Sequence, residues 1–494
     1  MKQETSQGSH AEHNGGHTPP WSPGWALAAL ALCMLLSSLG TSVANVALPT
    51  LAQAFAASFQ ATQWVVLSYL LTITALIVGI GRLGDIVGRR RLLLIGLAVF
   101  TASSIVCASA SALWVLIAAR AVQGLGAAVM MALALATVSE TVPKEKIGGA
   151  MGLLGTMSAV GTALGPVLGG FLIAGFGWQA MFLVNAPLGL LALLLAYRSL
   201  PADGSVSKAA DTRFDVLGTL LLALALSAYA LAMTVGGGRF SAPNLALLVA
   251  AVLGGALFVF AEARATSPLI RLTVFHDMRL NVGLGASAIA STVVMTTLIV
   301  GPFYLSRALG LDPASVGMVM TAGPLVAAAT GIPAGRLVDR FGVQGMTLVG
   351  LAGMGIACAA LSLIPSSLGV PGYVAPLTVL TAGYALFQAA NNAAIMREVG
   401  VDRRGVVSGM LNLSRNLGLI TGASLMGAVF ALGAGGGDLA AAPSGVVADG
   451  MHFTFGFAAA LVLAAIAAVA HNVRTGTALG HGGVVPEAGP PRTP

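Results

Sequence analysis

The stretch GRLGDIVGRRR at residues 81–91 is followed much later in the chain by a related stretch, GRLVDRFGVQG, at residues 335–345. Each stretch ends one long apolar run and begins another. The positions that recur at nearly the same separation are Gly81 with Gly335, Asp85 with Asp339, Gly88 with Gly342, Glu140 with Glu398, Gly152 with Gly409, Gly161 with Gly418, and Gly165 with Gly422. One coincidence would mean little in a chain with 64 glycines. Several near one offset predict two related halves.

The composition excludes a soluble protein. Charged residues make up 8% of the chain and apolar residues 57%, and the mean hydropathy is +0.90, whereas a soluble domain carries about 25% charged residues. Intrinsic disorder is excluded as well, since it requires low hydrophobicity. The three cysteines all lie within apolar runs, which excludes a disulfide scaffold. The basic residues are spread over many loops, so nucleic-acid binding has no support.

The apolar runs are long enough for membrane-spanning helices, which need about 20 residues each. Strict alternation of apolar and polar residues, the mark of a membrane barrel, is absent. The sequence therefore predicts an all-α polytopic membrane protein with fourteen spans and a retained first span. They lie at about 25–47, 64–82, 92–110, 113–139, 147–172, 179–198, 214–235, 245–262, 280–305, 316–335, 345–364, 374–396, 406–432 and 452–471.

The distribution of Lys and Arg predicts the orientation. With a cytoplasmic N-terminus, nearly all loop Lys and Arg residues fall on the cytoplasmic side, and Arg239 and Arg307 fall outside. We therefore expect a multi-pass protein of the cell inner (plasma) membrane with both termini in the cytoplasm. The expected units are a disordered tail at 1–24, a six-helix bundle at 25–198, two linker helices within 199–279, a second bundle at 280–471 and a disordered tail at 472–494.

Five motifs carry a family resemblance over essentially the whole chain between the tails. They are GRLGDIVGRRRLL (81–93), LIAARAVQGLGAA (116–128), GTALGPVLGG (161–170), WQAMFLVNAPLG (178–189) and LNLSRNLGLITGASLMGAV (411–429). These resemble the motifs of the major facilitator superfamily, and within it the fourteen-helix drug/proton antiporters of the EmrB/QacA type. The resemblance implies the major facilitator fold with two extra central helices, export rather than import, and proton antiport.

The loop motif suggests a gate. Its glycines allow tight turns, while Asp85 can accept the Arg89 guanidinium and cap the next helix. A charge network there would latch the halves in one state and release them in another; the alternative is a solvated ion pair in a positive-inside loop. The gating residues expected in the two halves are Gly81, Asp85, Gly88, Arg89, Arg90, Glu140, Asp339 and Arg340.

Two arginines fall inside spans. Arg120 cannot lose its charge, so its burial requires a partner or a water-filled cavity. It is expected either to bond backbone carbonyls structurally or to act in the cavity, beside Gln123 one turn away. Arg415 lies on the penultimate helix with Asn412 and Asn416, and could instead lean toward the cytoplasmic end.

The fifth span has the composition of a packing and bending hinge. Small residues at spacings of four let helices approach closely in lipid, and a proline breaks one helical hydrogen bond. The hinge residues are Gly161, Gly165, Pro166, Gly169 and Gly170.

The sequence departs from the antiporter group in the first span. The group usually carries Asp a few residues before an N-V-A-L-P stretch, and here that position is Gly40. With no carboxylate deep in any span, neutral, anionic or zwitterionic amphiphiles become more suitable substrates than dications. Amides should line the cavity, although any single one could be a helix–helix contact. The cavity residues expected are Asn45, Gln123, Asn185, Gln388, Asn391 and Asn392.

The functional expectation is secondary active efflux of amphiphilic small molecules by alternating access, with proton antiport. The alternatives are an importer or facilitator of a small metabolite or lipid-like compound, and a transport-inactive membrane sensor. No phosphate-loop, metalloprotease or nucleophile motif occurs, so neither an ATP-driven pump nor an enzyme is expected. We expect no cofactor, no metal site, no nucleic-acid partner and a monomer within the lipid bilayer.

Overall fold

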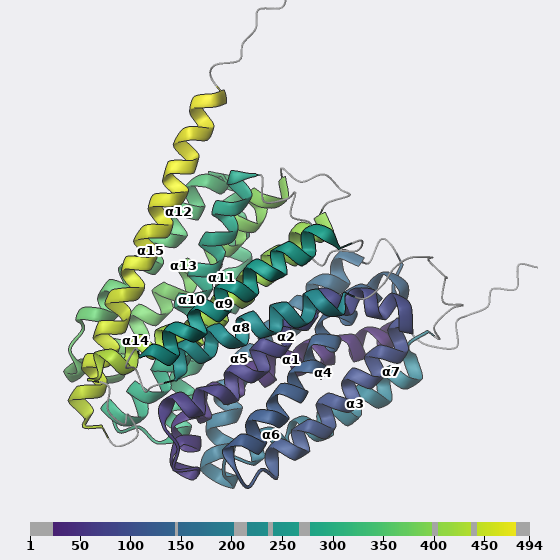
Figure 1. The fold of residues 1–494 in the computed structure, drawn as a ribbon, viewed down its shortest axis with the longest axis horizontal. Helices are drawn as coiled ribbons and strands as arrows, with labels where there is room; N and C mark the ends of the chain where they lie inside the picture. Colours follow the sequence, from purple (N-terminus) through teal and green to yellow (C-terminus); the bar gives the residue numbers. More distant parts are fainter. Residues whose placement is uncertain are drawn as a thin grey trace, which may run out of the picture.

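The computed structural model describes residues 23–143, 147–201, 215–235, 241–265, 277–397, 404–435 and 442–480. Within these residues, fourteen helices are long and apolar enough to cross a membrane, which confirms the expected number. Figure 1 shows the helices side by side in two groups, one from each half of the chain.

The first group contains the helices up to residue 199. A proline divides its last span, because Pro187 has no N–H to bond the Leu183 carbonyl one turn earlier, and α6 ends at Leu183. The bounds are α1 Pro23–Ala54, α2 Phe59–Val87, α3 Arg89–Ala108, α4 Leu113–Thr141, α5 Ile147–Phe176, α6 Ala180–Leu183 and α7 Asn185–Ser199.

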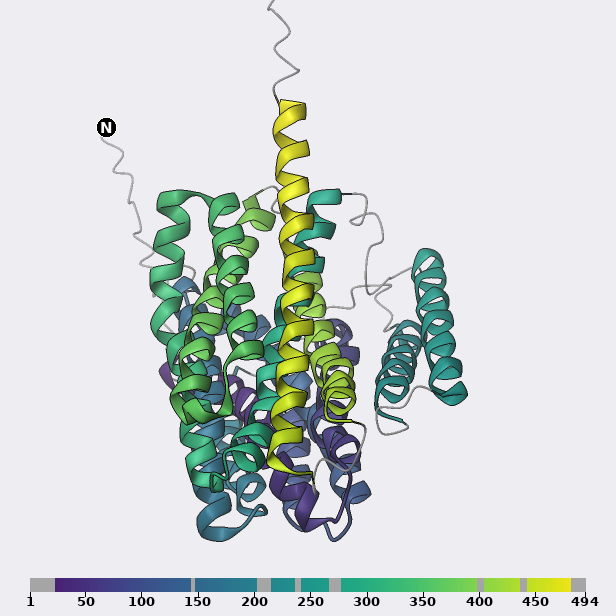
Figure 2. The same cartoon turned by 90° about the vertical axis from the view of Figure 1, so that its left-hand side faces the viewer.

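The later helices form the linker pair and the second group. After Pro302, α10 passes into a π-helical turn, η3, at Tyr304–Ala308. A disordered tail is expected from residue 472, but the chain is helical as far as Gly480, where α15 ends. Figure 2 shows α15 extending beyond the other helices. The bounds are α8 Val216–Thr234, α9 Ala242–Arg264, α10 Met278–Phe303, α11 Pro313–Phe341, α12 Val343–Leu363, α13 Gly369–Arg397, α14 Arg404–Gly433 and α15 Ser444–Gly480, with a short 3-10 turn, η4, at Ser366–Leu368.

The linker pair lies at the edge of the molecule. Helices α8 and α9 pack on each other, and α8 also packs on α2 and α14; Figure 2 shows the pair standing to one side of the two groups. Apolar side chains of α9 are exposed, with Leu245 at 64% and Val252 at 71%, as suits a surface in contact with lipid. The pair expected as central helices is therefore central in the sequence and peripheral in space.

The internal repeat has a structural counterpart in two helix reversals. Gly88 joins α2 to α3 with a φ of 100°, and Gly342 joins α11 to α12 with a φ of 87°. Because a side chain strains a backbone at such positive φ values, the glycines in the repeated stretch allow each helix to reverse without a longer loop. We call the end of the molecule that carries these two reversals the basic end, after Arg89 and Arg340.

The repeat also extends to helix crossings inside each half. Gly96 of α3 faces Gly126 of α4, and Gly350 of α12 faces Gly383 of α13; a Cβ at Gly126 or at Gly383 would lie 2.7 Å from the carbonyl oxygen of the facing glycine. Small residues are what helix crossings in lipid require, because no hydrophobic force drives the helices together. The two halves therefore share their closest contacts as well as their motif.

We predict that Gly126→Val destabilises the protein, because a Cβ there would lie 2.7 Å from backbone atoms of Gly96 and Phe100. Overpacking costs about 1–3 kcal/mol. Gly155→Val in α5 is the matched control, since a Cβ at Gly155 meets no atom within 4 Å. Thermal unfolding in detergent should give a lower Tm for Gly126→Val alone. Equal Tm values would contradict this account of the crossing.

Candidate functional site

The two groups of helices touch closely at the end opposite the basic end. The Phe59 ring of α2 meets Phe303 of α10 at 4.6 Å and Phe430 of α14 at 5.4 Å between centroids, and all three rings are buried. Nearby, Gln63 Nε2 donates a hydrogen bond of 2.9 Å to the Ala423 carbonyl of α14. The first and second halves are thus sealed together by aromatic and backbone contacts at this end.

A second contact between the halves joins α5 to α11. A Cβ at Gly170 would lie 2.6 Å from the Pro313 carbonyl oxygen and 3.0 Å from Gly317 Cα, so neither glycine leaves room for a side chain. The other hinge residues Gly161, Gly165 and Gly169 instead pack on α1. Pro166 lies within α5. The glycine face of α5 therefore serves one contact inside its own half and one between the halves.

The same helices are open toward the basic end. A Cβ built on Gly152 or Gly155 of α5, or on Gly331 or Gly335 of α11, meets no heavy atom within 4 Å; the same holds for Gly81 of α2 and Gly409 of α14. Close packing between the halves is therefore concentrated at one end. We call the open space beside these glycines the vestibule.

Arg120 is buried completely within the first half. Its guanidinium donates to the Val65 carbonyl (3.0 Å), to the Gly40 carbonyl (2.9 Å) and to Gln123 Oε1 (2.6 Å). The guanidinium carbon also lies 4.0 Å from the centroid of the Tyr69 ring. Polar and π-electron partners thus replace the water that the cation has lost.

These contacts favour the structural interpretation of Arg120 over a cavity role. Gln123 is equally buried, and its Nε2 donates to Ser104 Oγ at 2.7 Å. Gly40 lies in the same packed core, where a Cβ would be 3.0 Å from the Tyr69 hydroxyl. An Asp at this position would displace Tyr69, which donates to the Ser37 carbonyl. The first half therefore uses its intramembrane cation to join α1, α2 and α4.

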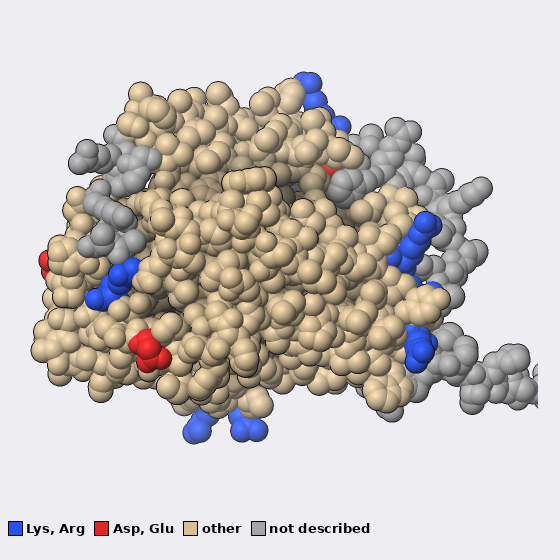
Figure 3. Space-filling model, turned by 90° about the horizontal axis from the view of Figure 1, so that it is seen from below, with Lys and Arg blue, Asp and Glu red and all other residues tan. Residues whose placement is uncertain are grey.

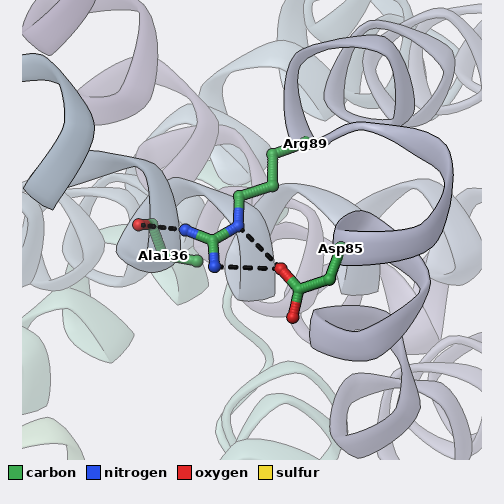
Figure 4. Close-up of polar contacts among 3 residues, drawn as sticks. All are labelled: Asp85, Arg89 and Ala136. Carbon is green, nitrogen blue, oxygen red and sulfur yellow. Dashed lines mark hydrogen bonds and ion pairs between the residues drawn. The ribbon is translucent and has the colours of Figure 1, made fainter. Parts of the chain in front are cut away.

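The loop motif contains the ion pair suggested by its spacing. Arg89 Nη2 and Nε lie 2.9 and 3.0 Å from Asp85 Oδ1, and Arg89 Nη1 donates to the Ala136 carbonyl of α4 at 3.2 Å (Figure 4). Arg90 donates to the Tyr197 carbonyl at the end of α7. Asp85 does not cap α3, because Gly88 occupies the capping position without a side-chain bond. The side chain of Glu140 lies outside the described residues.

The second copy of the motif lacks this ion pair within the described residues. Asp339 and Arg340 are both exposed, and Arg340 lies over the Phe341 ring at 5.3 Å. Val343 follows Gly342 where Arg89 follows Gly88, which removes the partner. Among the described residues, the ion pair of the loop motif is therefore present in the first half and absent from the second.

The amides expected in the cavity fall into two groups. Asn45, Gln123, Asn185 and Asn391 are buried inside their bundles; Asn391, for example, donates to the Gly283 carbonyl of α10 at 3.1 Å. Gln123 and Asn391 make helix–helix contacts, which is the alternative that the sequence left open. Asn45 and Asn185 donate within their own spans, to the Thr41 and Met181 carbonyls.

Gln388 and Asn392 instead reach a polar cavity of about 160 Å³ between α10, α13 and α14. Asn392 and Arg415 are exposed there. Gln388 Nε2 donates to the Tyr384 hydroxyl at 2.7 Å. The lining residues are Ser287, Gln388, Asn392, Met396, Leu411, Asn412 and Arg415.

Charged side chains elsewhere are sparse and lie at helix ends. Most of the face in Figure 3 carries none. The sequence analysis missed one acidic group: Glu262 of α9 is only 3% exposed, and both its carboxylate and that of Asp215 closely approach Gly218 of α8. The sequence held a signal for this pair: Glu262 lies in the last turn of one span, and Asp215 directly precedes the span before it.

The comparisons with known proteins agree with this geometry. The Major Facilitator Superfamily model matches residues 30–423 and residues 282–482. The chain belongs to the Major Facilitator Superfamily. It is 30% identical over 400 residues to riboflavin transporter RibZ of Clostridioides difficile, covering 81% of this chain and 86% of that protein. It is 33% identical over 417 residues to multidrug resistance protein Stp of Mycobacterium tuberculosis, covering 82% and 75%.

A solved structure shares the fold of this facilitator. The bacterial homolog of the human lysosomal transporter Spinster, crystallised in an inward-facing and unoccupied conformation, gives a TM-score of 0.67 at 16% identity, covering 92% of this chain and 97% of that one. The expected major facilitator fold and the resemblance to the drug-efflux group are confirmed. The chain is a multi-pass membrane transporter and not an enzyme.

We predict that Arg120→Lys lowers the Tm of the facilitator, because an ammonium group cannot reproduce the planar fork that reaches three acceptors. Leaving buried acceptors unpaired costs about 1–3 kcal/mol each. The exposed Arg340→Lys substitution serves as the control and should leave the Tm unchanged. A variant of Arg120 with wild-type Tm but no transport would overturn the structural role.

Proposed function

We propose that this facilitator exports amphiphilic small molecules by alternating access, in exchange for protons. The observation that carries the proposal is the one-sided seam: the halves meet at Phe59 and Gly170 and separate toward the basic end. A carrier that moves its substrate by rocking two bundles must have one such closed end at a time. Named relatives such as Stp, a multidrug resistance protein, support drugs and similar amphiphiles as cargo.

The basic end faces the cytoplasm in this proposal. Loops rich in Lys and Arg stay on the cytoplasmic side of inner membranes, and both described chain ends, at Pro23 and Gly480, belong to helices that reach this side. With that orientation the described conformation opens to the cytoplasm. This is the state in which an exporter loads its substrate.

Rocking of the halves would take place about the contact between α5 and α11. Gly170 and Gly317 bring the two backbones together there, and the missing N–H of Pro166 weakens α5 just before the contact. On closure of the basic end, Arg89 and Asp85 come near the facing half. In the open state, the ion pair and the hydrogen bond from Arg89 to the Ala136 carbonyl fix the positions of these two side chains.

Proton coupling in this facilitator cannot follow the usual first-helix route, since Gly40 carries no carboxyl group. Acidic residues at the ends of the helices, or ionisation of the substrate itself, take that role in the proposal. Transport of a small metabolite is the second candidate function, because RibZ is a riboflavin transporter and covers nearly as much of the chain as Stp.

We predict that Asp85→Asn reduces transport about tenfold or more with little loss of stability, since an exposed ion pair contributes only about 0–1 kcal/mol. Asp339→Asn is the matched control and should transport normally, because Asp339 makes no ion pair within the described residues. Initial rates in proteoliposomes, with Tm measured alongside, test this. Equal losses in both variants would contradict a latch in the first half.

We predict that cells expressing the facilitator accumulate a few-fold less of an amphiphilic dye than cells without it, and that collapsing the proton gradient removes the difference. Purified protein in vesicles should move the same dye faster under an imposed pH gradient. Higher accumulation would indicate import. Equal rates with and without the gradient would exclude proton coupling, and no transport at all would favour the membrane sensor.

A further inference from the structure

Arg415 of α14 differs from Arg120 in having no polar partner among the described residues. Within the described residues it makes no hydrogen bond or ion pair, and it is exposed in the polar cavity between α10, α13 and α14. Arg120 shows that this fold can satisfy an intramembrane guanidinium when its role is structural. Because no described residue pairs with the Arg415 guanidinium, its donors point to a group from outside the described part of the chain.

Arg415 lies inside a membrane span, where its charge needs either water or an anion. It lies eleven residues beyond the start of α14 at Arg404, or about 16 Å along the helix at 1.5 Å per residue. This position is inside the candidate span Gly409–Gly433, and the cavity is also lined by Met396, next to the end of α13. The described carboxylates all lie at helix ends; Asp277, for instance, caps the start of α10. A cation at this depth is costly unless water or an anion receives it.

The cavity wall around Arg415 combines amide and hydroxyl groups, which can donate and accept hydrogen bonds, with apolar atoms. Gln388 and Asn392 supply amide N–H groups and Ser287 a hydroxyl, and the Tyr384 hydroxyl fixes the Gln388 amide at 2.7 Å. A guanidinium with flanking donors matches the paired oxygens of a carboxylate, sulfonate or phosphate. Met396 and Leu411 provide an apolar border on which the adjoining part of an amphiphile can rest.

Comparison of the two halves shows that the position of Arg415 is not charged in the first half. Arg415 lies three residues before Gly418, and Ser158 lies three residues before the matching Gly161. Ser158 bonds Ser38 of α1 at 2.6 Å and takes part in packing. The same position thus packs helices in one half and presents a charge to the cavity in the other.

We propose that this cavity binds the acidic group of an anionic or zwitterionic amphiphile, with Arg415 as the residue that selects its charge. The inference rests on the proposed export function and deepens it. At about 160 Å³ the cavity holds the acidic group alone, and the rest of the molecule extends into the vestibule. An anion in place also neutralises the cation while the halves close around it, so loading lowers the barrier to reorientation.

The test uses three probes of one shape and different charge: 1-naphthaleneacetate, 1-naphthalenemethanol and 1-naphthalenemethylamine. Their binding to the full chain in lipid nanodiscs is measured by calorimetry or competition. The wild type should bind the acetate about tenfold more tightly than the amine. Arg415→Gln should abolish that preference, Arg415→Lys should retain part of it, and Arg415→Glu should reverse it toward the amine.

Arg264→Gln is the matched control, because Arg264 lies on the peripheral α9 over the Phe260 ring, and it should keep the wild-type preference. Unchanged Tm values show that each variant is folded. A preference for the amine, a preference that survives Arg415→Gln, or no binding of any probe would overturn the inference. Export itself would stand in each case if dye accumulation still falls in expressing cells, so the two proposals fail separately.

Discussion

Hydrocarbon around the helices is the constraint on which this structure depends, because a polar group at that depth has no water to bond. Within the described residues, the acidic side chains lie at helix ends, and acceptors surround Arg120, the one guanidinium that is completely buried. Val65, Gly40 and Gln123 surround Arg120 and tie α1, α2 and α4 together. Arg415 is the exception, and the proposed binding site follows from that difference.

The second determinant of the structure is the set of positions at which two helix backbones can approach each other closely. Glycines that face each other across helix crossings, such as Gly96 with Gly126 and Gly350 with Gly383, make each half a rigid unit. Between the halves, close approach is concentrated at one end, around Gly170. Two rigid units joined at one end can rock, whereas contacts spread along the whole seam would hold them fixed. Alternating access therefore needs the uneven distribution of glycine contacts.

Much of the fold could be predicted from the sequence, because span length and the repeated loop motif are properties of short stretches. The partners of buried groups could not, since the carbonyls of Val65 and Gly40 that receive Arg120 belong to every residue alike. The same limit divides the amides: Asn391 and Asn392 are neighbours in sequence, yet one bonds α10 and the other reaches the cavity. The peripheral place of α8 and α9 also depended on packing.

The most direct test of the central claim is a pair of distances measured by electron spin resonance in lipid. Spin labels on Gly155→Cys and Gly331→Cys report the basic end, and labels on Phe176→Cys and Leu432→Cys, exposed at the ends of α5 and α14, report the other; the three native cysteines are buried. When a transported amphiphile is added, the account predicts that the basic-end distance shortens in part of the population while the other lengthens. Two distances that stay constant, or that change in the same direction, would contradict rocking about the α5–α11 contact.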